Sequence, residues 1–240
     1  MSISIAIVAH PKRRAWAHRL SVATGGMIIP DDLGLGAKAN HLHAWEYLDN
    51  AGSLLPKQGD WGVVLEDDVV LCEDFERNLE RMLDKAPSTV VSLYLGRGRP
   101  PQYQRRISSV IANDVSFITA DALFSGQGYA LPIGYFSAPI IDQLWGIDLP
   151  IDEAITQWVR GWHGSVSYPK FSLIEHRDGP TLIDDHGDGQ PRNGPTALCD
   201  SDCDPSGARL PEIRKAWLLA GHNTPWDLGS IPLPEGATTS

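Results

Sequence analysis

The sequence is short of two features that would place it in a special class. It has 3 cysteines in 240 residues, an odd number and too few for a disulfide framework. It also has no apolar run long enough to cross a bilayer. The apolar stretch at the N-terminus, Ile3–Ala9, soon gives way to Lys12, Arg13 and Arg14. We therefore expect a cytoplasmic protein without a membrane span.

Basic residues are scarce as well. The chain has 20 Lys and Arg against 30 Asp and Glu, which gives a net charge of −10. Residues 1–106 carry 13 of each kind, whereas residues 107–240 carry 7 basic and 17 acidic side chains. An acidic protein is a poor non-specific binder of nucleic acid. Residues 97–106 are the exception and are predicted to form a loop that can contact a polyanion, because they contain no acid and four arginines: Arg97, Arg99, Arg105 and Arg106.

Apolar strands alternate with amphipathic helices over the first 95 residues. The pattern predicts strands at Ile3–Ala9, Met27–Ile29, Trp61–Leu65 and Val90–Leu95, with helices at residues 12–23, 37–48 and 75–83 between them. Such alternation is typical of an α/β domain with a mostly parallel sheet. We predict a single Rossmann-like domain with helices on both faces of its sheet.

The second half is less regular. Short strands are predicted around residues 115–117 and 129–131, and helices at residues 151–159 and 211–220. Residues 177–209 are rich in Asp, Gly and Pro, which favours a long functional loop. We assign residues 1–176 to the domain and residues 177–240 to a lid or C-terminal extension packed on it.

An acidic triplet, Glu66-Asp67-Asp68, directly follows the apolar strand at Trp61–Leu65. Adjacent acids between apolar segments are costly to bury without compensation. If the strand continues through them, Glu66 and Asp68 point to the same face. Ligands bind at the carboxyl ends of strands in such sheets, and Mg²⁺ or Mn²⁺ bridging to phosphates suits paired carboxylates. The alternative is an acidic start to the next helix, which fits Glu73 and Asp74 better.

The segment Trp-x-Val-Val-Leu-Glu-Asp-Asp-Val at residues 61–69 resembles the signature of GT-A-fold glycosyltransferases. The resemblance is to family 25, which acts on lipopolysaccharide and collagen, and to small phage-encoded enzymes that modify DNA. It covers about residues 1–180 and includes Asn40-His41-x-x-Ala44-Trp45. It implies a UDP-sugar donor and a metal, Mn²⁺ or Mg²⁺, bound by Asp68 with help from Asp67. Glu66 would then approach the donor ribose, or the metal through water.

Two further groups follow from this resemblance. A predicted strand ending at Glu175-His176 matches the late histidine that serves as an additional metal ligand, and neutral imidazole suits Mn²⁺. Asp152 and Glu153 match an acidic pair at the start of the acceptor-side helix. An inverting transferase needs a carboxylate there to deprotonate the acceptor hydroxyl. A strand-edge histidine and a helix N-terminal pair are the structural alternatives.

Donor contacts are also expected from Asp31 or Asp32, which can accept hydrogen bonds from uracil or ribose, and from Arg13, Arg14 and Lys38, which can meet the diphosphate. Surface charge is the alternative for each. The strand near Gly126-Gln127-Gly128 resembles the glycine-containing strand beside the sugar pocket. It is equally compatible with a simple turn.

Two motifs that could indicate other functions lack the sequence context that those functions need. Gly34-Leu35-Gly36-Ala37-Lys38-Ala39 matches a dinucleotide fingerprint, but it follows the second strand, so an oxidoreductase is rejected. Cys199 and Cys203 lack the second pair that a zinc site needs. A non-catalytic carbohydrate-binding module remains as the alternative of another class, although it would not need the acidic triplet.

The acceptor is the open question. The arginines of residues 97–106 favour a 5-hydroxymethylpyrimidine in phage DNA, contacted through phosphates. A duplex base would have to flip out to be reached. A glycan, lipid-linked or protein acceptor is the alternative. If the protein is phage-encoded, the host cytoplasm is its expected location.

Overall fold

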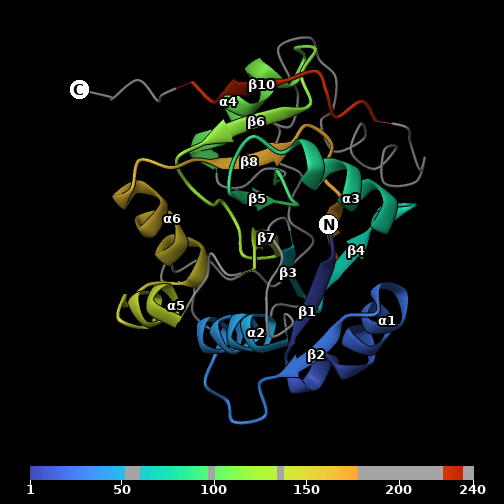
Figure 1. Ribbon diagram of the computed structural model, residues 1–240, viewed down its shortest axis with the longest axis vertical. Helices are drawn as coiled ribbons and strands as arrows, with labels where there is room; N and C mark the ends of the chain where they lie inside the picture. Colours follow the sequence, from blue (N-terminus) through green and yellow to red (C-terminus); the bar gives the residue numbers. More distant parts are fainter. Residues whose placement is uncertain (52–59, 97–100, 134–137, 178–223, 235–240) are drawn as a thin grey trace.

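The computed structural model describes residues 1–51, 60–96, 101–133, 138–177 and 224–234 (Figure 1). Its main element is an eight-stranded sheet in the order β10-β6-β8-β5-β7-β3-β1-β2, and β4 and β9 form a separate two-stranded sheet. The strands are β1 (Ile3–Ala9), β2 (Met27–Pro30), β3 (Trp61–Glu66), β4 (Val69–Leu71), β5 (Val90–Ser92), β6 (Phe117–Ala120), β7 (Gly128–Pro132), β8 (Val166–Pro169), β9 (Ile174–His176) and β10 (Ser230–Pro232).

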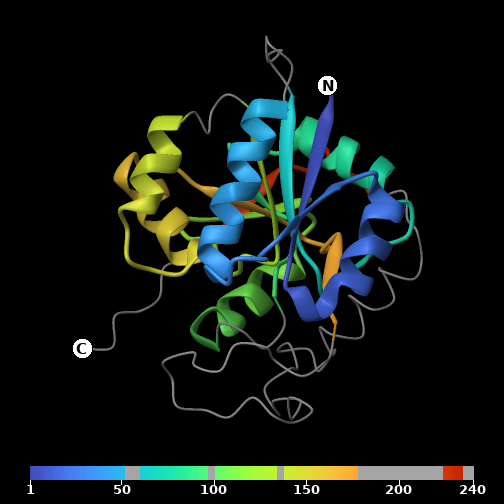
Figure 2. The same cartoon turned by 90° about the horizontal axis from the view of Figure 1, so that it is seen from below.

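Helices cover both faces of the main sheet (Figure 2). One core cluster joins the sheet to α2, α4, α5 and α6, and a second joins it to α1 and α3. The helices are α1 (Arg14–Thr24), α2 (Ala37–Ala51), α3 (Phe75–Lys85), α4 (Pro101–Ile111), α5 (Ala138–Trp145) and α6 (Ile151–Gly161), with a 3-10 turn at Pro11–Arg13 before α1. The predicted α/β class, with a mostly parallel sheet between two helical layers, is confirmed.

The pairing of β1 with its neighbours sets the edge at which polar residues collect. β1 is parallel to β2 and β3, and Val8 lies opposite Glu66. The residues that follow these strands therefore emerge at one edge of the sheet. β7 is antiparallel to both β3 and β5, and its first residue, Gly128, lies opposite Leu65. The start of β7 thus reaches the edge at which β1 and β3 end.

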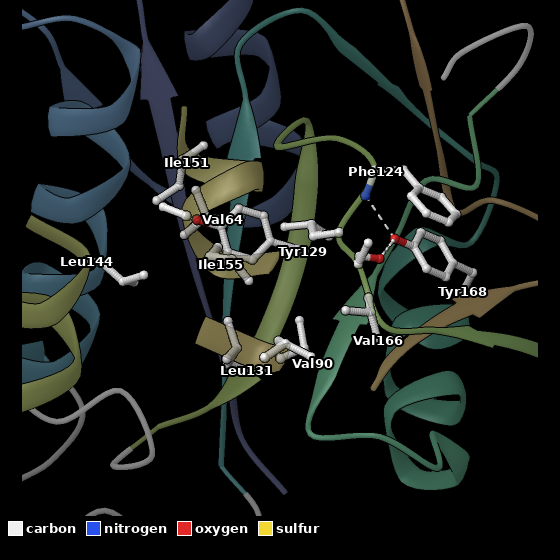
Figure 3. Close-up of a cluster of buried hydrophobic side chains, with 14 of the residues drawn as sticks. Val64, Val90, Phe124, Tyr129, Leu131, Leu144, Ile151, Ile155, Val166 and Tyr168 are labelled. Carbon is white, nitrogen blue, oxygen red and sulfur yellow. Dashed lines mark hydrogen bonds between the residues drawn. The ribbon is translucent and has the colours of Figure 1, made fainter. Parts of the chain in front are cut away.

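Tyr129 of β7 lies in the middle of the core cluster on the α2 side (Figure 3). The view shows it beside Val64 of β3 and Ile151 and Ile155 of α6. Tyr168 of β8 lies farther along the same cluster, where its hydroxyl accepts from the Phe124 N–H at 2.9 Å. The Tyr168 hydroxyl therefore ties β8 to the segment between β6 and β7.

Two predictions about local structure were wrong. Residues 101–106 belong to α4 and are not a loop, because Ile107, Val110 and Ile111 bury one side of a helix. Pro101 is well suited to the first helical position, where its missing N–H is not needed. The predicted strand at Val90–Leu95 ends at Ser92, and α5 was not predicted.

Part of the predicted C-terminal extension is a strand of the main sheet. β10 pairs in parallel with β6, with Ile231 opposite Ile118. The predicted helix at residues 211–220 lies outside the described residues, as does the predicted loop at residues 177–209 apart from its first residue. Within the described ranges, no helix combines the length and the apolar character needed to cross a membrane.

Gly62 of β3 provides a test of the packing between α2 and the sheet. A Cβ at this position would lie 2.7 Å from Cζ3 of Trp45, whose ring is 1% exposed and cannot move aside. We expect Gly62→Ala to lower the free energy of unfolding by about 1–3 kcal/mol in urea denaturation. Gly161→Ala is the matched control, since a Cβ there meets nothing within 4 Å, and an equal loss in both variants would contradict the assignment.

Candidate active site at the carboxyl ends of β1 and β3

Asp67 and Asp68 form the turn that joins β3 to β4, and each is only 4% exposed. Arg13, which follows β1, is hydrogen-bonded to both. Its Nη1 donates to Oδ1 of Asp67 at 3.2 Å and to Oδ2 of Asp68 at 2.5 Å. The backbone N–H of His10 also donates to Oδ2 of Asp67 at 2.7 Å. The end of β1 thus supplies positive charge and hydrogen bonds to the end of β3.

The two carboxyl groups differ in their electrostatic surroundings. Burial raises the pKa of Asp67, although the His10 N–H and Arg13 act in the opposite direction. Burial acts on Asp68 in the same sense, but the hydrogen bonds and charges of His176 and Arg13 outweigh it and lower the pKa. Asp68 is therefore the carboxylate held most firmly in its charged form.

The second sheet brings His176 to this turn. β9 is antiparallel to β4, and His176 lies opposite Val69. Nε2 of His176 lies 3.3 Å from Oδ2 of Asp68, and this hydrogen bond raises the pKa of His176. The predicted strand ending at Glu175-His176 is confirmed, and the imidazole lies beside Asp68.

A tryptophan platform borders the same turn and was not predicted from the sequence. The guanidinium groups of Arg13 and Arg177 lie over the Trp16 ring, 5.5 Å and 5.0 Å from its centroid. The backbone N–H of Arg177 also donates to the Asp68 carbonyl at 2.8 Å. The only sequence signal for Arg177 is that it follows His176, because the contact with Trp16 of α1 depends on the tertiary structure.

Glu66 faces a different group of residues. Because β3 ends at Glu66 and the next two residues form a turn, the prediction that Glu66 and Asp68 share one strand face was wrong. Oε1 of Glu66 lies 3.5 Å from Nε2 of His41, and the Glu66 side chain is 31% exposed. The triplet therefore divides: Asp67 and Asp68 face Arg13, and Glu66 faces α2.

Asp152 reaches this edge from the first turn of α6. A Cβ at Gly126 would lie 3.0 Å from Cγ2 of Ile151 and 3.6 Å from Oε1 of Glu66, so the start of α6 and the end of β3 meet at this glycine. Burial raises the pKa of Asp152, and the negative charges of Glu153 and Glu66 raise it further. Glu153 itself is exposed. Of the predicted acidic pair, Asp152 is the less exposed member, and the charge of Glu66 acts on it.

The other predicted donor contacts lie farther from the triplet or are engaged elsewhere. Asp32 is exposed and pairs with Arg14 at 2.5 Å. The ammonium group of Lys38 donates to the backbone carbonyl of Ile147, which ties α2 to the segment between α5 and α6.

The predicted acceptor-binding arginines are only partly described. Arg105 is exposed on α4. Arg106 donates to the Pro234 carbonyl at 2.8 Å, and its guanidinium lies 4.4 Å from the centroid of the Tyr103 ring. Arg97 and Arg99 lie outside the described residues, as do Cys199 and Cys203.

One donor atom of the turn at Asp67-Asp68 is suited to bind a divalent cation. Oδ1 of Asp68 is buried without a hydrogen-bond partner in the described part of the chain, so its lone pairs are available. Nε2 of His176 lies 3.3 Å from the other oxygen of the same carboxylate and would exchange this hydrogen bond for the cation to serve as a ligand. No set of three or more His, Cys, Asp or Glu side chains in the described ranges is arranged around a metal position. Mg²⁺ sites, however, commonly use one or two carboxylates, with substrate phosphates and water as the remaining ligands.

These observations define an α/β protein with a carboxylate-rich site at the ends of its parallel strands. No protein-family model and no curated protein sequence matches the chain. Among solved structures it is similar to a glycosyltransferase involved in the glycosylation of the major capsid of PBCV-1, with 12% sequence identity, covering 65% of this chain and 76% of that chain, at a TM-score of 0.31.

The raised pKa of Asp152 makes the stability of the protein depend on pH. The folded pKa exceeds the unfolded value of 3.8, so the folded protein binds more protons between the two values, and stability falls as pH rises through this window. Above the window the folded protein holds a charged, largely buried carboxylate. We expect Asp152→Asn to raise the melting temperature at about pH 7, with a gain that disappears toward about pH 3.

Thermal melts followed by circular dichroism across this pH range measure the effect. Glu153→Gln, at the exposed neighbouring position, is the control and should leave the melting temperature nearly unchanged. A gain for Asp152→Asn that does not vary with pH would show that the carboxyl is not the cause.

Proposed function

We propose that this protein is a metal-dependent glycosyltransferase that transfers a sugar from a UDP-sugar donor to an acceptor hydroxyl. One observation carries the proposal: the fold brings carboxylates of two different kinds to a single edge of the sheet. The hydrogen bonds and charges of His176 and Arg13 lower the pKa of Asp68, whereas burial raises the pKa of Asp152. Paired titratable groups in contrasting surroundings are typical of sites that both bind charge and move a proton.

The first group suits the diphosphate of the donor. Asp68 and His176 would hold Mn²⁺ or Mg²⁺, which when bound would neutralise the charge that develops on the leaving diphosphate. Arg13 lies between the two aspartates, so its guanidinium is placed to donate hydrogen bonds to phosphate oxygens at the same position. Glu66, which is partly exposed beside them, would accept hydrogen bonds from donor hydroxyls.

The second group suits the acceptor. Asp152 would take the proton of the acceptor hydroxyl as the hydroxyl oxygen attacks the anomeric carbon. The bond from that carbon to the diphosphate oxygen breaks at the same time, and the electron pair leaves with the UDP. Attack from the face opposite the diphosphate inverts the anomeric centre. A base whose pKa is raised toward the working pH is more effective in this step than an ordinary aspartate.

The proposal is tested by comparing Asp152→Asn with Glu153→Gln in a transfer assay. Purified protein is incubated with Mn²⁺, a panel of nucleotide sugars and hydroxymethylcytosine DNA, and the products are weighed by mass spectrometry. Asp152→Asn should lose about 10²–10⁴-fold in transfer rate, and Glu153→Gln should retain most of it. EDTA should abolish transfer by the wild type, and added Mn²⁺ should restore it.

The thermal melts of Asp152→Asn at neutral pH separate loss of the base from unfolding, since a variant that melts at or above the wild-type temperature and is still inactive has lost the base. Equal activity in the wild type and Asp152→Asn would rule out the assigned base. A protein that binds free sugars but turns over none of the nucleotide sugars would support the carbohydrate-binding alternative.

For the acceptor, we propose a 5-hydroxymethylpyrimidine in DNA, with a glycan, lipid-linked or protein hydroxyl as the alternative. Support comes from the charge on α4. Arg105 is exposed on this helix, and a cation there suits a phosphate backbone.

We expect Arg105→Ala to weaken transfer to hydroxymethylated DNA and to reduce the slope of log affinity against log salt concentration by about 1. Donor hydrolysis without DNA should not change, because Arg105 is not part of the carboxylate site. Arg19→Ala, an exposed arginine on α1 of the opposite layer, is the control. If both variants behave alike, or if DNA is not modified at all, the acceptor is of another class.

A further inference from the structure

His41 is a buried histidine at the candidate site to which the proposed chemistry assigns no role. It is 1% exposed and lies on the inner face of α2 with Trp45 and Leu48. Its Nδ1 lies 3.3 Å from the Tyr129 hydroxyl, and its Nε2 lies 3.5 Å from Oε1 of Glu66. Nε2 is buried and has no hydrogen-bond partner within the described ranges. A polar atom in this position is costly unless something completes its hydrogen bonding.

The hydrogen bonds of Tyr129 determine which nitrogen of His41 carries the proton. The indole N–H of Trp45, which can only donate, donates to the Tyr129 hydroxyl at 3.0 Å. Burial raises the pKa of Tyr129, so this hydroxyl keeps its own proton at neutral pH. Nδ1 of His41 is the remaining polar group beside it in the described structure, and it must accept that proton. The neutral imidazole then carries its hydrogen on Nε2, toward Glu66.

The three rings are fixed in place by the core. Tyr129 and Trp45 are 0% and 1% exposed, and each of the pairs His41–Tyr129 and Trp45–Tyr129 has its ring centroids 5.8 Å apart. Tyr129 is surrounded by apolar side chains of the sheet and α6 (Figure 3). The direction of Nε2 is therefore set by packed aromatic rings and not by a mobile side chain.

Glu66, by contrast, has room to respond. The distance of 3.5 Å to Nε2 is longer than a normal N–H···O hydrogen bond, and the side chain is partly exposed. Gly126 lies beside the pair, since a Cβ there would be in van der Waals contact with Oε1 of Glu66 at 3.6 Å and with Cε1 of His41 at 3.8 Å. A small rotation of the Glu66 carboxylate closes the hydrogen bond to a donor that is already fixed.

We propose that His41 is a positioning residue for Glu66. With its proton held on Nε2 by Tyr129 and Trp45, it binds one oxygen of the Glu66 carboxylate and leaves the other to accept hydrogen bonds from the hydroxyl groups of the donor's ribose or sugar. The identity of this ligand rests on the proposed function, whereas the protonation of His41 does not.

The protonation is tested directly by ¹⁵N NMR of the histidine side chains. The signals of His41 are identified as those that are missing from the spectrum of His41→Gln. The expected result in the free protein at neutral pH is a neutral ring with hydrogen on Nε2. Tyr129→Phe keeps the packed ring and removes the hydroxyl, and it should shift His41 to a mixture of tautomers. Hydrogen on Nδ1, or a charged imidazole, in the wild type would overturn the proposal.

The positioning of Glu66 is tested by a double-mutant cycle on donor binding. Tyr129→Phe should raise KM for the nucleotide sugar about tenfold while kcat changes little, as expected when a ground-state contact is weakened. In His41→Gln the amide nitrogen replaces Nε2 as a donor without needing Tyr129. Adding Tyr129→Phe to this variant should then have little further effect. If His41 and Tyr129 only support the fold, a smaller fraction of the protein would be active in each of these variants, and the measured kcat would fall in all of them.

His43→Gln, on the same helix and in contact with Trp145, is the control and should leave KM unchanged. Equal KM values for Tyr129→Phe and the wild type would overturn the positioning role even if the tautomer is as expected. If the wild type uses no nucleotide sugar, it is the proposed function that fails. The tautomer of His41 in the free protein then still tests whether Tyr129 keeps the proton of His41 on Nε2.

Discussion

The structure depends on how the ends of β1 and β3 accommodate two adjacent buried carboxylates. Asp67 and Asp68 would repel each other and lose their hydration if nothing compensated them, and removing one partner of a buried ion pair typically costs about 3–5 kcal/mol. Arg13 and the His10 N–H provide the compensation because β1 runs parallel to β3 with Val8 opposite Glu66. The strand register that builds the sheet is therefore also the register that builds the site.

Much of the fold could be predicted from the first 95 residues, where local signals agree with the tertiary structure. The strand at Ile3–Ala9 and the helix at residues 75–83 appear nearly as expected, because apolar periodicity and burial coincide there. The second half was harder, since its strands are short and pair over long distances. The direction of β7 between β3 and β5 is set by tertiary contacts, and the helix over residues 101–111 was obscured by its arginines and proline.

The candidate site was predictable where one segment carries the signal and not where several meet. The acidic triplet stands out because charge follows directly after an apolar strand, and the strand ending at His176 could be identified in the same way. The pairing of β4 with β9 places that histidine beside Asp68, and it cannot be predicted from either segment alone. The arginines over Trp16 and the meeting of the start of α6 with Glu66 at Gly126 likewise join parts of the chain that are far apart.

The turn at the end of β3 explains why three consecutive acids can have separate functions. If the strand continued through them, Glu66 and Asp68 would compete for the same surroundings. Because it ends at Glu66, that residue faces the core of α2 and β7, through His41 and Tyr129. Asp68 faces the other layer, through Arg13 and β9. Glu66 and Asp68 are thus positioned by contacts on different faces of the sheet.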